Sequence, residues 1–164
     1  MSLDELSLPE NDKTYVDLTK DFFGQLRDVQ MAGHLCDVVL KGCEDTCTGI
    51  PCHRLVLCAC SSYFRSMFTS DWRESPPTGI QLNNIQSNTL QELVRYAYSM
   101  EITINEENVY PVLTAALFLD ISSVSKLCWR FVENHMTITN CLTVYCLADL
   151  HNNPQLASST FYPN

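Results

Sequence analysis

The sequence predicts an α+β domain in which a cluster of helices carries a small three-stranded sheet on one side. Apolar residues recur with helical spacing in about six segments, and three short β-rich runs lie among them in mixed order. The chain has 164 residues, of which 46% are hydrophobic and 18% are charged. This composition is sufficient for one domain to bury a core of its own.

The first helix is expected from residue 18 to about residue 29. Residues 1–14 precede it, have no hydrophobic period, and are expected to form a flexible tail. Four apolar side chains share one face of the helix: Leu18, Phe22, Leu26 and Val29.

The three strands and two short helices are expected between residues 36 and 85. The strands are predicted at 36–41, 50–52 and 79–85, where β-rich or alternating residues are bounded by turn residues. The helix at 53–60 is apolar nearly all round, which predicts that it is buried. A serine can cap the helix that follows at 61–68.

The second half of the chain is expected to be mainly helical. An extended segment is expected at 101–105. Helices are predicted near 87–98, 109–117 and 122–135, and one more begins after Thr139. The apolar face of the first of these consists of Leu90, Leu93, Val94, Ala97 and Tyr98.

Charge and cysteine content exclude several classes of function. The formal net charge is −9, which disfavours binding to nucleic acid or to anionic lipid because cations must replace phosphate counterions. The longest uncharged apolar stretch, 109–119, is far shorter than the roughly 20 residues of a membrane helix. Nine cysteines, an odd number, are typical of reduced thiols. We therefore expect a cytoplasmic protein, with the nucleus as the alternative.

No enzymatic or metal-binding motif emerges from the sequence. The patterns G-x-G-x-x-G, G-x-x-x-x-G-K-[ST] and G-x-S-x-G do not occur. The spacing of Cys43, Cys47 and Cys52 does not fit a zinc site. We expect no catalytic residue, cofactor or metal, and a zinc protein or a cysteine-based redox sensor is the least favoured alternative.

Two adjoining motifs resemble one protein family. Residues 35–40 read LCDVVL, and residues 51–68 read PCHRLVLCACSSYFRSMF. They resemble the BTB (POZ) family in its kelch-like subgroup, whose pattern is a strand with C-D-V followed by P-x-H-R-x-V-L-x-x-x-S-x-Y-F-x-x-M-F. Residues 93–109 are similar to a later segment of the family, and residues 141–157 are similar to the start of its BACK domain.

The resemblance implies a domain organisation. It predicts a BTB/POZ domain over 15–136 and the first helices of an incomplete BACK domain over 137–164. In this family a substrate-recognition module follows, and we expect that this chain does not contain it. Whether the chain is a short isoform or a fragment stays open.

The resemblance also implies a homodimer. In BTB proteins the N-terminal helix packs across a two-fold axis, which assigns Leu18, Phe22, Leu26, Val29 and Asp37 to the dimer interface. Each apolar side chain contributes about 1.5–3 kcal/mol if it is fully buried. The alternatives are that the helix packs on its own core, or that it pairs with other BTB proteins.

Two residues, His53 and Arg54, are expected to have structural roles. Asp37 can form a charge-assisted pair with Arg54, or it can face solvent. His53, at the start of a helix, is expected to be a hydrogen-bonded residue without a catalytic role.

The functional prediction depends on the segment after residue 68. Kelch-like BTB domains that recruit the cullin-3 ubiquitin-ligase scaffold carry a hydrophobic-x-Glu motif there, and Trp72-Arg73-Glu74 matches it. A large apolar side chain in a polar loop is costly to expose, and Trp is favoured at interface hot spots. The alternative is that Trp72 folds back onto its own domain.

The resemblance assigns six residues to the cullin contact: Trp72, Glu74, Met67, Phe68, Leu142 and Tyr145. The sequence departs from the family at two positions. Trp72 is bulkier than the usual Met or Leu, and Met100 replaces a glycine. We therefore predict a non-enzymatic dimerisation and adaptor domain that binds cullin-3. The alternative is a homo- or hetero-dimerising module without cullin binding.

Overall fold

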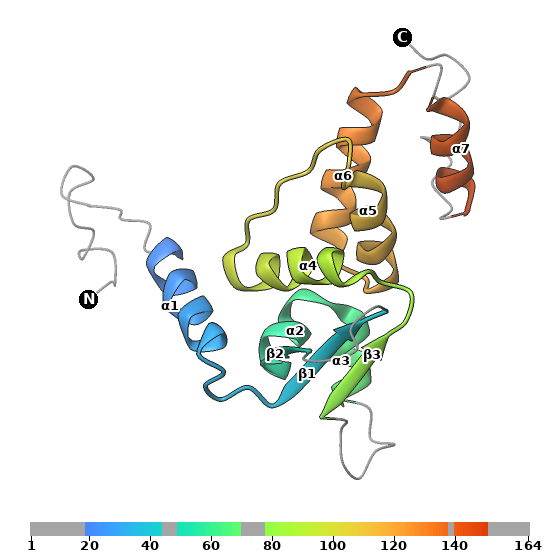
Figure 1. Cartoon of the computed structure of the whole chain (residues 1–164). Coiled ribbons are helices and arrows are strands. Elements are labelled where there is room, and N and C mark those ends of the chain that lie inside the picture. Colours follow the sequence, from blue (N-terminus) through green and yellow to red (C-terminus); the bar gives the residue numbers. More distant parts are fainter. Residues whose placement is uncertain (1–18, 44–48, 70–77, 138–139, 151–164) are drawn as a thin grey trace, which may run out of the picture.

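The computed structural model describes residues 19–43, 49–69, 78–137 and 140–150 (Figure 1). Within these ranges it has seven helices and three strands, which confirms the predicted α+β class. The helices are α1 (Thr19–Met31), α2 (Arg54–Cys60), α3 (Ser62–Thr69), α4 (Ser87–Ser99), α5 (Val109–Phe118), α6 (Ser122–Asn134) and α7 (Cys141–Leu150). The strands are β1 (Val38–Gly42), β2 (Ile50–Cys52) and β3 (Gly79–Leu82).

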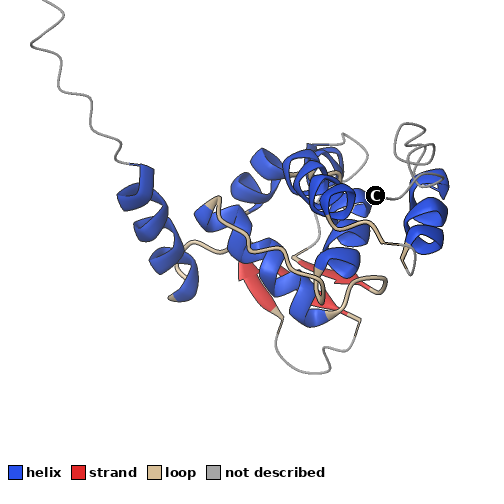
Figure 2. Cartoon of the chain, turned by 90° about the horizontal axis from the view of Figure 1, so that it is seen from above, coloured by secondary structure: helices blue, strands red, loops and turns tan. Residues whose placement is uncertain are grey.

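The sheet has the strand order β2-β1-β3. β1 pairs antiparallel with β2, where Val38 lies opposite Cys52, and parallel with β3, where Leu40 lies opposite Ile80. Alternate residues of β1 and β3 are buried, as expected for strands with one face on the core. Figure 2 shows the strands together at one side of the helical cluster.

Helix α4 is the central element of the core and contacts α1, α2, α5 and β1. All five residues of its predicted apolar face are buried. α5 and α6 pack against each other beyond it, and Val112, Val124 and Cys128 are among their buried residues. The helical period in the sequence therefore locates the core well in these long helices.

Helix α2 differs from its prediction, because it is not buried. Leu57 is its only buried residue, and the side chain of Leu55 is 81% exposed. A helix of seven residues at the border of the domain has neighbours on one side only, so its outer apolar residues face solvent. Two smaller differences concern strands: β3 ends at Leu82, and residues 101–105 form a loop.

Helix α1 packs against α4 and β2 at one side of the molecule (Figure 1). Gln30 is buried and its Nε2 donates a hydrogen bond to the carbonyl oxygen of Pro51, at 2.7 Å. Phe23 and Leu26 are half-buried on the same side, whereas Phe22 is 62% exposed. Phe23 and Leu26 therefore lie on the side of α1 that faces the domain, and Phe22, a residue of the predicted dimer interface, is left outward.

The end of α4 has a left-handed residue. Met100 follows α4 with φ 57° and ψ 17°, and its N–H donates a hydrogen bond to the carbonyl oxygen of Tyr96. Glycine is favoured in this conformation because it has no Cβ. The backbone therefore adopts a turn that is less strained for glycine. Met100, which stands where the family has glycine, thus costs conformational free energy at this turn.

Candidate protein-interaction surfaces

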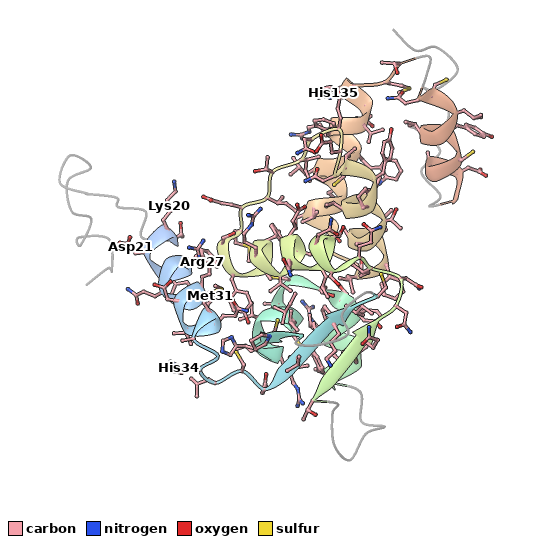
Figure 3. The ribbon with its side chains drawn as sticks, in the orientation of Figure 1. Lys20, Asp21, Arg27, Met31, His34 and His135 are labelled. Atoms are coloured by element: carbon pink, nitrogen blue, oxygen red, sulfur yellow. The ribbon has the colours of Figure 1, made fainter. Side chains whose placement is uncertain are left out.

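Large apolar side chains are exposed at several places in the described part of the chain, and two of these regions form candidate surfaces. We define the α1–α2 surface as Phe22, Leu35 and Leu55. We define the α3–α5 surface as Ser62, Tyr63, Ser66, Met67, Phe118 and Asp120, which line one open groove of about 540 Å³. Figure 3 labels His34, which is next to Leu35 of the first surface, far from His135 at the other end of the molecule.

The α1–α2 surface is held in place by His53. The backbone N–H of His53 donates to the hydroxyl oxygen of Tyr98 at 2.8 Å, and its Nδ1 lies 2.8 Å from the same oxygen. Its Nε2 lies 2.8 Å from the carbonyl oxygen of His34. A carbonyl can only accept, so Nε2 carries the hydrogen and Nδ1 accepts from Tyr98. This network joins the start of α2 to the connection between α1 and β1, and Tyr98 is buried.

Asp37 lies at the N-terminus of α2. Its Oδ1 accepts a hydrogen bond from the N–H of Arg54 at 2.8 Å, and its Oδ2 lies 4.0 Å from Arg54 Nε. A carboxylate at this position satisfies a helix N–H that has no partner within the helix. The guanidinium carbon of Arg54 also lies 5.4 Å from the ring centroid of Phe68. Asp37 therefore fixes α2 next to the segment that carries Leu35.

The predicted dimer residues are distributed as follows. Phe22 is exposed, whereas Leu26 and Val29 are half-buried, and Leu26 packs against the core of its own domain. Leu18 lies outside the described residues. Sequence reasoning missed Leu35 and Leu55, which are 87% and 81% exposed. Leu55 belongs to an apolar run without a period, so no sequence signal separated it from its buried neighbour Leu57.

The α3–α5 surface is positioned by Ser61. Its hydroxyl donates to the carbonyl oxygen of Leu119 at 2.5 Å and accepts from the N–H of Phe64 at 3.2 Å. Ser61 thus caps α3 and also joins the start of α3 to the end of α5. On the outside of this junction the rings of Tyr63 and Phe118 lie 5.2 Å apart, and Phe118 is 43% exposed.

Of the two predicted residues in α3, the structure places one in the groove. Met67 lines it. Phe68 instead stacks on the buried Phe64, with ring centroids 5.9 Å apart, and does not line the groove. Sequence reasoning missed Phe118 and Asp120 as surface residues. Tyr63 was part of the family pattern, but nothing in the sequence indicated its contact with Phe118.

The other predicted cullin contacts lie elsewhere. Trp72 and Glu74 lie outside the described residues, and α3 ends at Thr69, shortly before them. In α7, Leu142 is 72% exposed and Tyr145 is half-buried, while Val144 and Ala148 are buried. Figure 1 shows α7 well separated from α3, so Leu142 and Tyr145 are not part of the groove.

A second groove of about 350 Å³ lies where α5, α6 and the start of α7 meet. Tyr110 and Phe131 provide aromatic surface in it, and His135 stacks on Phe131 with ring centroids 4.0 Å apart. Asn140 lies at the rim and accepts from the N–H of Thr137 at 2.8 Å. This groove borders the helix that carries Leu142.

The cysteines of the described ranges form no disulfide. Burial raises the pKa of the Cys52 thiol to about 12, and that of Cys128 to about 12. Cys36 Sγ lies 3.8 Å from Nε2 of His53, but desolvation and the charge of Asp37 raise its pKa as well. These thiols stay protonated, which is unfavourable for a nucleophile or a metal ligand.

The described residues lack two further kinds of feature. They contain no group of three or more His, Cys, Asp or Glu side chains that could hold a metal ion. No helix among them is long and apolar enough to cross a bilayer.

Comparisons with known proteins agree with this architecture. Residues 26–136 match the BTB/POZ domain family. Kelch-like protein 23 of Pongo abelii is 41% identical over 138 residues, which is 83% of this chain and 24% of that protein. Kelch-like protein 3 of Danio rerio is 43% identical over 117 residues, or 71% of this chain and 19% of that protein. The chain thus spans about a quarter or less of the length of these relatives.

A solved structure gives the same result for the fold. The BTB domain of zebrafish PATZ1 superposes with a TM-score of 0.62 at 26% sequence identity. The match covers 75% of this chain and 99% of that one.

Proposed function

The chain belongs to the BTB/POZ domain family, and from this premise we propose that it is a homodimer that binds the N-terminal domain of cullin-3. BTB domains mediate dimerisation and partner binding, and the kelch-like members are non-enzymatic adaptors. A protein-interaction module is therefore the general function of the chain. The proposal adds the identity of two partners: a second copy of the chain and a ubiquitin-ligase scaffold.

The α1–α2 surface supports the homodimer. Phe22, Leu35 and Leu55 are each more than 60% exposed in one chain. Their full burial would contribute roughly 5–9 kcal/mol gross, before the cost of association. A two-fold interface pairs the same surface on both copies, so one apolar surface on each chain is sufficient to form a homodimer.

The observation that carries the cullin proposal is the α3–α5 surface. It presents two packed aromatic rings and Met67 around an open groove, next to the end of α3. The chain reaches Trp72 three residues after Thr69. The indole of Trp72 would therefore add to an apolar surface that already exists. Aromatic residues backed by a rigid element are typical of interface hot spots.

The groove between α5, α6 and α7 supports a second part of the contact. In the kelch-like family, which this chain resembles, the N-terminal arm of the cullin packs near the first BACK helices. The groove has aromatic walls, and Leu142 is exposed on the adjoining helix. An extended apolar arm is the kind of ligand that this shape can accept.

Calorimetric titration against the N-terminal domain of cullin-3 tests the proposal. We expect the wild-type chain to bind at tens of micromolar or tighter, and Trp72→Ala to weaken binding by about thirtyfold or more. Glu74→Ala should cost less, because a charge at the rim of an interface stays partly hydrated. Leu127→Ala is the matched control, since Leu127 is an exposed apolar residue of α6 outside both grooves.

Two results would overturn the cullin proposal: no heat with the wild-type chain at tens of micromolar, or equal binding by Trp72→Ala. The α1–α2 surface would then still favour the second candidate, a dimerising module without cullin binding.

A further inference from the structure

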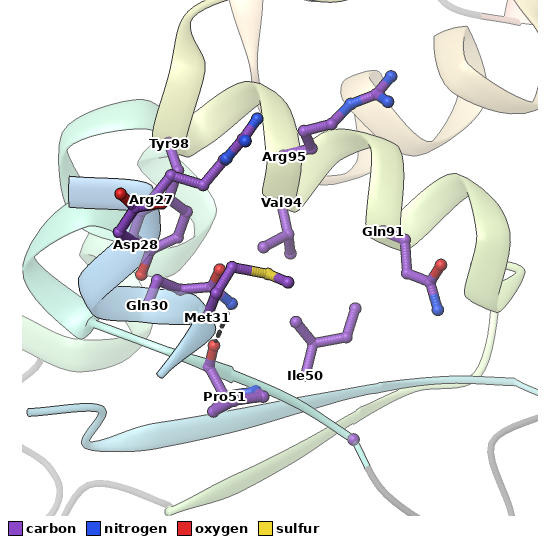
Figure 4. Close-up of a pocket in the computed structure, with 11 residues that line it drawn as sticks. Arg27, Asp28, Gln30, Met31, Ile50, Pro51, Gln91, Val94, Arg95 and Tyr98 are labelled. Carbon is purple, nitrogen blue, oxygen red and sulfur yellow. Dashed lines mark hydrogen bonds between the residues drawn. The ribbon is translucent and has the colours of Figure 1, made fainter. Parts of the chain in front are cut away.

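A cleft of about 750 Å³ lies between α1, β2 and α4 (Figure 4). Its inner surface is apolar, with Met31 from α1, Ile50 and Pro51 from β2, and Val94 from α4. Neither the dimer proposal nor the cullin proposal uses it. An apolar cleft of this size exposes surface that a ligand segment could cover.

The opening of the cleft carries positive charge in a strongly acidic chain. Arg27 from α1 and Arg95 from α4 both line it, and Figure 4 shows them on the same side of the apolar residues. Asp28 is also a lining residue, so the two arginines and one aspartate leave a local charge of +1. The whole chain has a charge of −9. The preferred occupant is therefore an apolar segment with acidic side chains.

The strand at the border of the cleft favours docking through side chains. β2 is an edge strand of the sheet, but Pro51 has no N–H and its carbonyl already accepts from Gln30. This part of the edge cannot pair with an added strand.

We propose that residues 3–8 of the same chain dock in this cleft. They read Leu-Asp-Glu-Leu-Ser-Leu. The leucines suit the apolar inner surface, and Asp4 and Glu5 complement Arg27 and Arg95. Residues 1–18 as a whole contain five acidic residues and one lysine.

The length of the intervening chain permits this arrangement. α1 starts at Thr19, and its second half forms one wall of the cleft. From Thr19 to Arg27 the helix rises about 12 Å. Residues 9–18 can span about 33 Å when extended, which is more than the return requires.

Tethering lowers the affinity that docking needs. A segment joined by a short flexible connection is present at an effective concentration of about a millimolar. Docking of residues 3–8 also leaves the predicted dimer residues of α1 uncovered, because Arg27 and Met31 lie on a different side of the helix from Phe22 and Val29. The inference therefore does not depend on either proposed partner.

Backbone ¹⁵N relaxation of residues 3–8 in the full chain tests the proposal. We expect order parameters above about 0.6 in the wild type, since values below that are typical of flexible chain. Arg27→Glu with Arg95→Glu should lower them below about 0.6. Adding Asp4→Lys and Glu5→Lys to that variant should restore the order, because the charges are then exchanged. Arg130→Glu is the matched control, an exposed arginine of α6 away from the cleft, and should have no effect.

Two outcomes would overturn the proposal. The first is a flexible segment in the wild type, and the second is order that the double reversal leaves unchanged. If the segment is flexible and a separate acidic, leucine-containing peptide shifts the Val94 and Arg95 amide signals, the cleft is assigned to an external peptide instead.

Discussion

The two exposed apolar surfaces are similar in composition and different in how they are supported. The α3–α5 surface rests on a serine cap, a hydrogen bond between two helices and an aromatic pair. The α1–α2 surface belongs to one terminal helix, held by half-buried side chains and by Gln30, and to the outer side of a short helix. The first is preorganised for a ligand, whereas the second gains support when a partner covers it. We therefore expect the proposed dimerisation and the proposed cullin binding to respond to different substitutions.

The largest expected effect concerns the α1–α2 surface. Phe22→Asp together with Leu55→Asp should weaken the dimer on the order of a hundredfold or more, because two charges would be buried without partners. Light scattering should then give a mass near 18.6 kDa, where the wild type gives twice that value.

Leu142→Asp is the control for this experiment, since Leu142 is similarly exposed on α7. It should leave the mass of the dimer unchanged. A wild-type protein with the mass of one chain at micromolar concentration would contradict the prediction.

A smaller effect is expected from the network that supports this surface. His53→Ala removes the acceptor of the Tyr98 hydroxyl hydrogen inside the core. It should lower the free energy of unfolding by about 1–3 kcal/mol. Urea denaturation measures this.

Tyr98→Phe and the double variant complete a thermodynamic cycle for this pair. The double variant should cost less than the sum of the single ones, because the two side chains share one interaction. Additive effects would show that the network does not couple α2 to the core.

Substitutions in the α3–α5 surface should change the affinity for a partner rather than the free energy of unfolding. Phe118→Ala removes an exposed ring that packs on Tyr63, and we expect about a tenfold loss of affinity for the cullin-3 N-terminal domain. The dimer mass and the free energy of unfolding should change little, since the ring is partly solvated. If the same variant dissociated the dimer, the separation of the two surfaces would be wrong.

The smallest effect is expected at Met100, the residue that follows α4, a helix that contacts elements of both regions. Met100→Gly removes the Cβ from a left-handed residue and should raise the free energy of unfolding by about 0.5–1 kcal/mol. Dimer mass and cullin affinity should stay unchanged. Thermal or urea unfolding provides the measurement, and a loss of stability would show that packing of the Met100 side chain outweighs the strain.

The sequence predicted burial correctly where a long helical period coincides with contacts along the whole helix. In α4 all five predicted residues are buried, because a helix of 13 residues with neighbours along its length must turn its apolar face inward. It failed for α2, where Leu55 and Leu57 have the same character and opposite exposure. In a run without a period, only the position of the neighbours decides which side chain faces solvent.

The composition of the candidate surfaces also depends on which segments are neighbours in the fold. The sequence by itself determined the family, the α+β class and the presence of Tyr63 and Met67 in one helix, because local spacing and motifs encode these properties. Only the tertiary structure decided that Phe118 lies beside Tyr63, 55 positions away, and that Phe68 turns to the core. It also decided that Phe22 lies on the outer side of α1. These outcomes depend on contacts between distant segments, such as that of Ser61 with Leu119, which no local pattern contains.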